Sequence, residues 1–219
     1  MSDHRTRFLQ LAFDVQALRF GEFTLKSGRV SPYFFNAGRF DSGAALATLT
    51  RCYADALDAA GLDFDLLFGP AYKGIPLASA LGVEYARRGR DLPITFNRKE
   101  AKTHGEGGTL IGASLDGRRV LIVDDVITAG TAIREALGLI DTAGGRVAGI
   151  AIALDRQERL TDDDPRSAAQ RVADEQGVPV VSIAGLSDLL AFAGENATLD
   201  AERDRLLAYR SRYGSGPAR

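Results

Sequence analysis

Cysteine is almost absent from this chain of 219 residues, which contains only Cys52, so no disulfide can form within it. A small fold stabilised by disulfides is therefore excluded, and a reducing compartment is indicated. No apolar run approaches the about 20 residues that cross a bilayer, so we expect no membrane span. Residues 1–5 lead into a mixed helical pattern, which predicts no signal peptide. These features together predict a cytoplasmic protein.

An excess of basic residues is also lacking, because 27 lysines and arginines face 29 aspartates and glutamates, for a net charge of −2. General nucleic-acid-binding proteins carry a clear positive excess, so we expect no nucleic-acid partner. Hydrophobic residues make up 45% of the chain, which is enough for a substantial core and excludes a disordered chain. The length suits one domain, or at most two small ones.

Lysine is scarce even among the basic residues, since 23 of the 27 are arginine and the other four are Lys26, Lys73, Lys99 and Lys102. Lysine carries a compact ammonium group whose pKa can be shifted, and arginine cannot reproduce this property. The four lysines therefore either serve that chemistry or are chance survivors of genomic drift. Their positions in the motifs below bear on this choice.

Apolar periodicity predicts a series of alternating helices and strands along most of the chain. Helices are expected over residues 4–19, 42–60, 74–88, 130–143, 165–176, 186–192 and 199–213. A hairpin is expected over 22–35, and short buried strands over 65–68, 93–96, 119–123, 149–154 and 179–183. Residues 98–112 are polar, glycine-rich and aperiodic, which predicts a long loop with room for a short strand.

Strands that are apolar throughout and alternate with helices predict an α/β fold with a central, mainly parallel sheet flanked by helices. No linker or repeat divides the chain, so we expect one domain over 1–219. An N-terminal helix and β-hairpin would form a hood at about 1–40, followed by the core at about 41–213 and a flexible tail at 214–219. Ligands of such sheets bind where strands end, which points to the loops 69–74, 98–112 and 124–131.

The most informative of these loops follows the strand in residues 120–132. Two adjacent carboxylates, Asp124 and Asp125, end the strand, and they can accept hydrogen bonds from vicinal hydroxyl groups. The helix that follows offers free backbone N–H groups to a phosphate, and Thr128 and Thr131 can add hydroxyl donors. The segment is neither a Walker A loop nor a Rossmann fingerprint. The alternative, an ordinary strand–turn–helix capped by threonine, is weaker because two acids end a buried strand.

A second candidate site is the cationic segment 97–108. Arg98, Lys99, Lys102 and His104 lie within seven residues, and such like charges repel one another unless a polyanion arrives. Flanking glycines suit a lid that closes on a ligand. A solvated charged loop is the usual alternative for a charge run, but two of the four lysines and one of the two histidines lie here.

Three further segments are less specific when taken alone. The loop 69–74 offers backbone N–H groups and Lys73 to a pyrophosphate, but it also suits an ordinary helix entry. The hairpin with Lys26, Phe34 and Phe35 is more typical of core packing than of ligand contact. Arg156, just after a predicted strand, could equally belong to a surface loop of mixed charge.

The whole set of motifs resembles a known family. Residues 120–132 resemble the phosphoribosyl-pyrophosphate (PRPP) signature of type I phosphoribosyltransferases. The pattern R-K-E-x-K-x-H-G at 98–105 is similar to the catalytic loop of orotate phosphoribosyltransferases. The resemblance runs from about residue 8 to 213, and all four lysines fall on motif positions.

This resemblance implies an enzyme that transfers the ribose 5-phosphate group of PRPP to orotate. The products would be orotidine 5′-monophosphate and pyrophosphate, in de novo pyrimidine (UMP) biosynthesis. It also implies Mg²⁺ held mainly through PRPP and water, with no direct protein ligand. The family forms homodimers in which the catalytic loop reaches the neighbouring subunit's site, and neither a nucleic acid nor a membrane is an expected partner.

The resemblance also assigns site residues. Lys102, His104, Asp124 and Asp125 are expected to be catalytic, with Lys102 most coupled to the departure of pyrophosphate. The residues expected to bind PRPP are Lys26, Tyr72, Lys73, Arg98, Lys99, Lys102, His104, Asp124, Asp125, Val126, Ile127, Thr128, Ala129, Gly130, Thr131 and Ala132. Those expected to bind orotate are Lys26, Phe34, Phe35, Thr128 and Arg156. The aromatic pair would pack around orotate, and the fork of Arg156 would bind its carboxylate.

Two alternatives stay open from the sequence. A phosphoribosyltransferase for a purine base would share the PRPP signature, but the hairpin hood and Arg156 argue against it. A PRPP-sensing regulator without turnover would need a basic patch for nucleic acid. Residues 87–90 are the only compact candidate outside the cationic segment, and such a regulator would have little use for a cationic lid.

Overall fold

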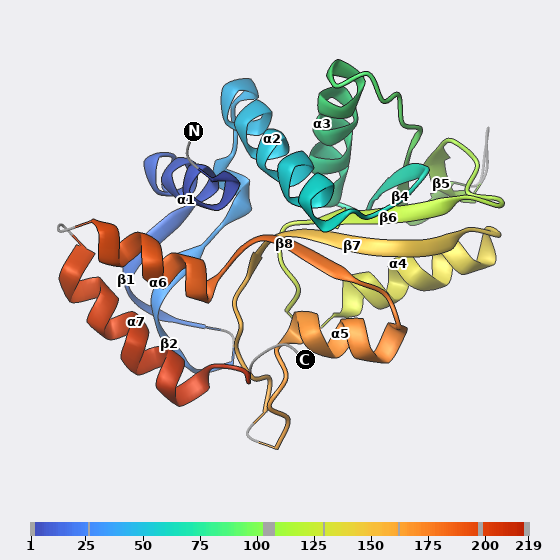
Figure 1. Cartoon of the computed structure of the whole chain (residues 1–219). Coiled ribbons are helices and arrows are strands. Elements are labelled where there is room, and N and C mark those ends of the chain that lie inside the picture. Colours follow the sequence, from blue (N-terminus) through green and yellow to red (C-terminus); the bar gives the residue numbers. More distant parts are fainter. Residues whose placement is uncertain are drawn as a thin grey trace.

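The computed structural model describes residues 3–25, 27–102, 108–128, 130–161, 163–196 and 199–216. A six-stranded sheet with strand order β5-β4-β3-β6-β7-β8 forms the core, and β1 and β2 form a separate antiparallel hairpin (Figure 1). The strands are β1 Leu18–Thr24, β2 Val30–Phe35, β3 Leu66–Gly69, β4 Ile94–Lys102, β5 Gly108–Gly112, β6 Arg119–Asp124, β7 Arg146–Asp155 and β8 Val180–Gly185. All neighbouring strands of the core are parallel except β4 and β5. The predicted α/β fold is confirmed.

Helices cover both faces of this sheet, with α2 and α3 on one side and α4 and α5 on the other (Figure 1). The helices are α1 His4–Asp14, α2 Gly43–Ala60, α3 Gly74–Arg87, α4 Thr131–Thr142, α5 Ala168–Gln176, α6 Leu186–Glu195 and α7 Asp200–Tyr213, with a 3-10 turn η1 at Ala37–Arg39. Local sequence fixes several ends. Ser42 accepts a hydrogen bond from the Ala45 N–H at the start of α2, and Gly61 ends that helix in a left-handed conformation.

The central strands divide their side chains between the two faces, because successive residues of a strand point to opposite sides. In β6, Leu121 and Val123 pack in the same apolar cluster as the helices α2 and α3. Val120 and Ile122 pack in the cluster that contains residues of α4 and α5. All four side chains are fully buried, so the carboxyl end of β6 is held in place from both faces.

The hood contains elements from both ends of the chain. Helix α1 and the β1–β2 hairpin lie beside α6 and α7, which are far away in the sequence (Figure 1). The ring of Tyr33 on β2 meets that of Tyr209 on α7 edge to face, with centroids 6.4 Å apart. The sequence placed only residues 1–40 in the hood. The C-terminal helices join it because the hairpin cannot bury its apolar face alone.

Two elements differ from the sequence-based expectation. The first helix ends at Asp14 rather than near 19, because Leu18 pairs with Phe35 in the hairpin and tertiary pairing outweighs the helical spacing. The segment 98–112 is mostly strand in its described part, since β4 runs to Lys102 and β5 pairs with it antiparallel. An edge ribbon of this kind is partly exposed and polar, so it lacks the apolar pattern by which buried strands are found.

The first residues of the expected flexible tail are hydrogen-bonded. Ser215 donates its N–H to the carbonyl of Gln157 at 2.7 Å, and Gly216 donates to the carbonyl of Pro165 at 2.9 Å. Gly214 forms an isolated β-bridge with Glu158. The chain just beyond α7 is therefore packed against the segment that follows β7, while 217–219 lie outside the described residues.

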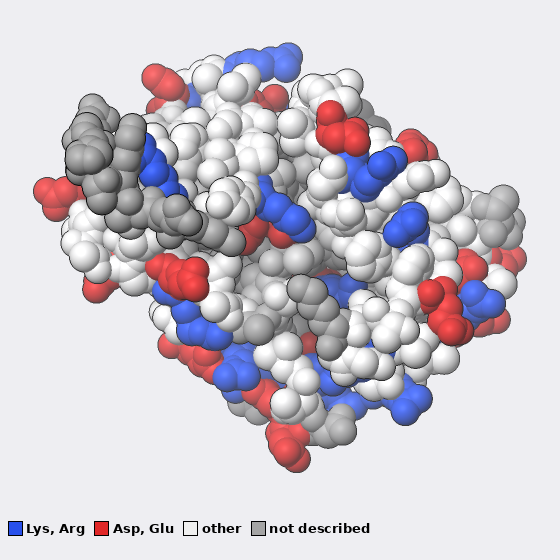
Figure 2. Space-filling view, turned by 180° about the vertical axis from the view of Figure 1, so that it is seen from behind, with Lys and Arg blue, Asp and Glu red and all other residues white. Residues whose placement is uncertain are grey.

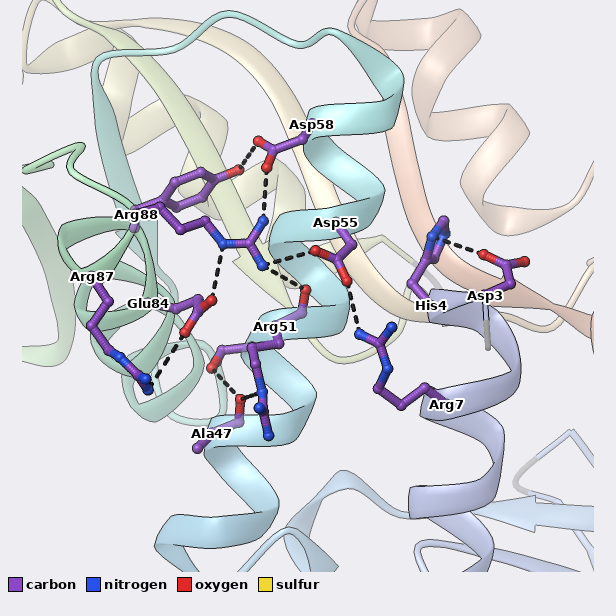
Figure 3. A network of polar contacts seen from close by, with 12 residues as sticks. Asp3, His4, Arg7, Ala47, Arg51, Asp55, Asp58, Glu84, Arg87 and Arg88 are labelled. Carbon is purple, nitrogen blue, oxygen red and sulfur yellow. Dashed lines mark hydrogen bonds and ion pairs between the residues drawn. The ribbon is translucent and has the colours of Figure 1, made fainter. Parts of the chain in front are cut away.

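An ionic network fastens α1, α2 and α3 together (Figure 3). Asp55 on α2 receives Arg7 of α1 at 2.9 Å and Arg88, just after α3, at 2.8 Å. Arg88 also pairs with Asp58 at 2.8 Å and with Glu84 at 2.9 Å. Burial would raise the pKa of Asp55, but the hydrogen bonds from Arg88 and Arg7 lower it below its ordinary value. Such a network fixes the relative positions of three helices more than it adds stability.

This network also bears on the proposed basic patch at 87–90. The guanidinium group of Arg88 is occupied by three acids, and that of Arg90 lies 4.2 Å from the ring centre of Phe64 and donates to the Phe64 carbonyl. Arg87 lies 4.0 Å from Glu84, so all three arginines have structural partners, which weakens the case for a nucleic-acid surface there. In the described part of the chain, no helix is long and apolar enough to cross a membrane.

Candidate active site

The acid pair lies where the sequence placed it, at the carboxyl end of β6 in the middle of the sheet. Its backbone is held from both sides. The hydroxyl of Tyr53, buried on α2, donates to the Asp124 carbonyl at 2.7 Å. The carbonyl of Asp125 accepts the N–H of Ala153 on β7 at 2.9 Å. These contacts fix the direction in which both carboxylates leave the strand.

Lys73 supplies the positive charge beside the two carboxylates of the acid pair. The ammonium Nζ of Lys73 lies 2.7 Å from Oδ2 of Asp125, whose side chain is only 8% exposed, whereas Lys73 is 55% exposed. Asp124 accepts the N–H of Asp125 at 2.9 Å but lies beside its negative charge. Burial and then the neighbouring carboxylate of Asp125 raise the pKa of Asp124 to about 7. The pair is therefore poised to gain from hydroxyl donors or cationic groups of a ligand.

The loop 69–74 brings Lys73 to this place. At Gly74 a Cβ atom would lie 2.6 Å from the carbonyl oxygen of Val123 and 2.4 Å from Cδ of Pro70, so no side chain fits there. Glycine thus lets the start of α3 approach the end of β6 closely. The Ala71–Tyr72 peptide is cis, and the Tyr72 side chain is 67% exposed.

Asn97 on β4 supports the same loop, since its Oδ1 accepts the N–H of Ala71 at 2.8 Å. The sequence did not single out this residue. Its only signal was its place at the head of the cationic segment, where it follows a short apolar strand. A contact across 26 positions cannot be inferred from such a pattern.

The threonine loop after the acid pair enters α4 without a side-chain cap from the described residues. Gly130 has φ +73°, a left-handed conformation that favours glycine, and Thr131 and Ala132 open the helix. The backbone N–H groups of this first turn are thus available to an anion. Thr128 is exposed, whereas Ile127 is only 7% exposed. Val126 is only partly buried against the core, whereas Ile127 can offer a ligand little besides its backbone.

Phe34 and Phe35 are adjacent in β2 and point to opposite sides of it. Phe35 packs in the hood against Phe8 and Phe40, with ring centroids 6.0 and 6.2 Å away. Phe34 stacks with Phe23 at 5.5 Å, near the guanidinium of Arg19. The two rings thus lie on opposite sides of β2, and their packing around orotate stays a prediction.

Arg156 lies just beyond β7, facing the hairpin. Its side chain is 17% exposed, and its guanidinium carbon lies 4.5 Å from the ring centre of Tyr33. Nη2 is 2.7 Å from Oε1 of Glu158, so this arginine has a carboxylate partner within the chain. The position after a strand of the sheet, as the sequence predicts, is compatible with a ligand bound between hood and core.

The remaining candidates are described only in part. Lys26, His104 and Ala129 lie outside the described residues, as do the side chains of Lys99 and Lys102. Arg98 is described, and its Nη1 is buried without a hydrogen-bond partner among the described residues. Seen from behind, the molecule is hollowed near the middle of this face, with acidic and basic side chains at the edge of the hollow (Figure 2).

The raised pKa of Asp124 predicts a stability effect in the ligand-free protein. The folded state binds the Asp124 proton more tightly than the unfolded state does. The contribution of this proton to the free energy of unfolding is therefore present at low pH and is lost as pH rises through about 7. Asp124→Asn cannot ionise and should be more stable than wild type at pH 8, and this advantage should decrease by about 2–3 kcal/mol between pH 8 and pH 5. The difference should shrink towards pH 5 in thermal unfolding scans. The exposed control Asp91→Asn should show no such pH dependence, and a pH-independent difference for Asp124→Asn would contradict the assignment.

Known proteins that are similar to this chain are phosphoribosyltransferases. Residues 40–180 match the family model of the phosphoribosyl transferase domain. The chain is 74% identical over 215 residues to the orotate phosphoribosyltransferase of Xanthomonas campestris pv. campestris (strain B100), covering 98% of both chains. It is 68% identical over 214 residues to that of Stenotrophomonas maltophilia (strain K279a), again covering 98% of both chains.

Solved structures agree with these relatives. The crystal structure of orotate phosphoribosyltransferase from Francisella tularensis superposes with a TM-score of 0.86 at 41% identity, over 95% of this chain and 99% of that one. The enzyme of Mycobacterium tuberculosis H37Rv in complex with PRPP gives a TM-score of 0.64 at 26% identity, over 85% and 98%. From the sheet with its acid pair, the hood and these matches, we conclude that the chain belongs to the orotate phosphoribosyltransferase family.

Proposed function

We propose that this chain transfers the ribose 5-phosphate group of PRPP to orotate, releasing pyrophosphate and forming orotidine 5′-monophosphate for pyrimidine synthesis in the cytoplasm. The observation that carries the proposal is the acid pair beside a cation, with Lys73 Nζ 2.7 Å from Asp125 at the end of β6. Acceptors for sugar hydroxyls and a cation for a phosphate are thereby adjacent. A free helix N-terminus follows within seven residues of Asp124.

In this reaction the anomeric carbon loses pyrophosphate, and positive charge develops on the ribose ring. Asp124 and Asp125 would accept hydrogen bonds from the ribose hydroxyls and favour the developing charge. Thr128, Thr131 and the backbone N–H groups of 129–132 would bind the 5′-phosphate. Because Lys73 is half-exposed while paired with Asp125, its ammonium group can also approach the pyrophosphate.

The leaving group carries several negative charges that the site has to neutralise. Arg98, Lys99, Lys102 and His104 of the cationic segment would supply positive charge, and Lys102 would assist departure by charge or by proton donation. When bound through PRPP and water, Mg²⁺ neutralises further charge on the phosphates. The carboxylates of Asp124 and Asp125 could accept hydrogen bonds from the water shell of this ion, which requires no direct protein ligand. Closure of the segment would also keep water from hydrolysing PRPP.

Orotate would bind between the hood and the sheet. Arg156 would receive its carboxylate, while Lys26, Thr128 and the backbone of Phe34 and Phe35 would line the remaining contacts. Because orotate is already an anion, its attack on the anomeric carbon needs no strong general base from the chain.

We further propose a homodimer in which the cationic segment of one subunit acts in the partner's site. Three large apolar side chains support an interface near this segment. Tyr72, Val83 and Ile111 are 67%, 62% and 40% exposed, and they belong to the loop before α3, to α3 itself and to β5. Helix α3 packs against β4, the strand that pairs with β5, so the three positions lie on neighbouring elements.

The activity is tested by following the loss of orotate absorbance when purified protein is mixed with orotate, PRPP and Mg²⁺. Parallel reactions omit Mg²⁺ or replace orotate with adenine, guanine, hypoxanthine or uracil. We expect conversion of orotate alone, dependent on the metal. Turnover of another base instead would overturn the assignment of the orotate-binding residues. Binding of PRPP without turnover of any base would favour a regulator.

The shared site is tested by complementation between two inactive variants, Lys73→Ala and Lys102→Ala. After dissociation and reassociation of an equal mixture, we expect about a quarter of wild-type activity, because half of the dimers are hybrids with one intact site each. A mixture of Lys73→Ala with Lys73→Met should stay inactive and serves as the matched control. Absence of recovery in verified hybrid dimers would show that Lys102 acts within its own subunit.

A further inference from the structure

Arg156 is held in place by Glu158, an acid that has no role in the proposed reaction. Oε1 of Glu158 accepts a hydrogen bond from Nε of Arg156 at 3.0 Å and forms an ion pair with its Nη2 at 2.7 Å. The two side chains are only 17% and 11% exposed. An ion pair this strongly covered loses much of its hydration, so it is expected to persist only with good geometry and further hydrogen bonds.

The hairpin of the hood supplies these further contacts. The hydroxyl of Tyr33 donates to Oε1 of Glu158 at 3.3 Å, and burial raises the pKa of Tyr33, which keeps this donor protonated. The Tyr33 ring lies under the guanidinium group at 4.5 Å, a cation–π contact. Oγ of Ser31 accepts from Nη2 at 3.3 Å and donates to the carbonyl of Tyr33 at 2.7 Å. Glu158 and Ser31 thus restrain the guanidinium group of Arg156 within its plane, and the ring of Tyr33 restrains it from below.

The restraint leaves one edge of the guanidinium group for a ligand. A guanidinium presents a side edge, formed by Nε and one terminal nitrogen, and an end edge formed by the two terminal nitrogens. Glu158 occupies the side edge through Nε and Nη2. The hydrogen bonds that Arg156 donates to Glu158 and Ser31 come from Nε and Nη2 and leave Nη1 unused. The end edge is therefore directed away from Glu158, and a carboxylate can bind there through Nη1, while the second N–H of Nη2 is shared with Oγ of Ser31.

We propose that Glu158 is a positioning residue that aims the end edge of Arg156 at the carboxylate of the pyrimidine substrate and so sets the preference for an acidic base. The proposal rests on the proposed function, because it assigns Arg156 to the substrate carboxylate. Since Glu158 balances much of the charge of Arg156, recognition of the substrate carboxylate depends on the direction of the guanidinium N–H groups more than on net charge attraction. A base without the carboxylate leaves this buried edge unpaired, which is a strong source of discrimination.

The test is steady-state kinetics with orotate and PRPP varied separately. Glu158→Ala is expected to raise the KM for orotate by about tenfold, the effect of losing one charge-assisted contact, with the KM for PRPP unchanged. Glu158→Gln keeps an acceptor oxygen and should recover part of the loss. Tyr33→Phe keeps the ring but removes the hydroxyl, so it should raise the same KM by a smaller factor. These two milder variants carry the test if Glu158→Ala does not fold.

A matched control is Glu175→Ala, which removes the acid that pairs with Arg171 at 2.6 Å on the surface of α5. It should leave both KM values unchanged. An equal rise in the KM for orotate and for PRPP in the folded Glu158 variants, or no rise in either, would overturn the proposal. If the wild-type enzyme converts orotate and the variants have an unchanged KM for orotate, only the role of Glu158 is refuted. A wild-type enzyme that never uses orotate refutes the proposed function itself, and this proposal with it.

Discussion

The arrangement of this molecule depends on two adjacent carboxylates that leave a fully buried strand side by side. Like charges so close together are unfavourable, and burial with the neighbouring charge raises the pKa of Asp124 to about 7. Several features lower this cost. Lys73 pairs with Asp125, and it can do so because Gly74 lets α3 start against the end of β6. Tyr53 fixes the backbone from the α2 side. Repulsion between the two carboxylates thus remains in the ligand-free protein. The hydroxyl groups of a ligand, and the cations bound with it, can reduce this repulsion.

The second half of the site has a different construction. Parallel strands and their loops form the part with the acid pair, whereas the part with Arg156 is closed by the hairpin and the C-terminal helices. Ser31 and Tyr33 of β2 reach Arg156 and Glu158 on the segment after β7, and Tyr209 of α7 packs against Tyr33. An arginine tied to its own acid keeps its direction before a ligand arrives. In the proposed reaction, the first half would bind the sugar phosphate and the restrained guanidinium group of Arg156 would bind the base.

Much of the first half could be predicted from sequence because its signals are local. An apolar strand that ends in two acids, followed by small residues and a helix, fixes the order of groups along a single stretch of chain. The supports of this site could not be predicted in the same way. Tyr53 meets Asp124 across 71 positions, Asn97 meets Ala71 across 26, and Tyr33 meets Glu158 across 125. Phe34 and Phe35 point to opposite sides of β2, because the side chains of successive residues alternate along a strand. The sequence left room for a short strand in 98–112 but did not define β5 or the length of β4, because these residues carry no apolar repeat.

The most direct test of the central claim is a crystal structure of the chain with PRPP and Mg²⁺ in the absence of orotate. We expect the ribose hydroxyls within hydrogen-bond distance of the carboxylates of Asp124 and Asp125. The 5′-phosphate should lie on the first turn of α4 and the pyrophosphate on the Lys73 side. A ribose ring bound away from the acid pair, with both carboxylates still facing only Lys73 and solvent, would contradict the account.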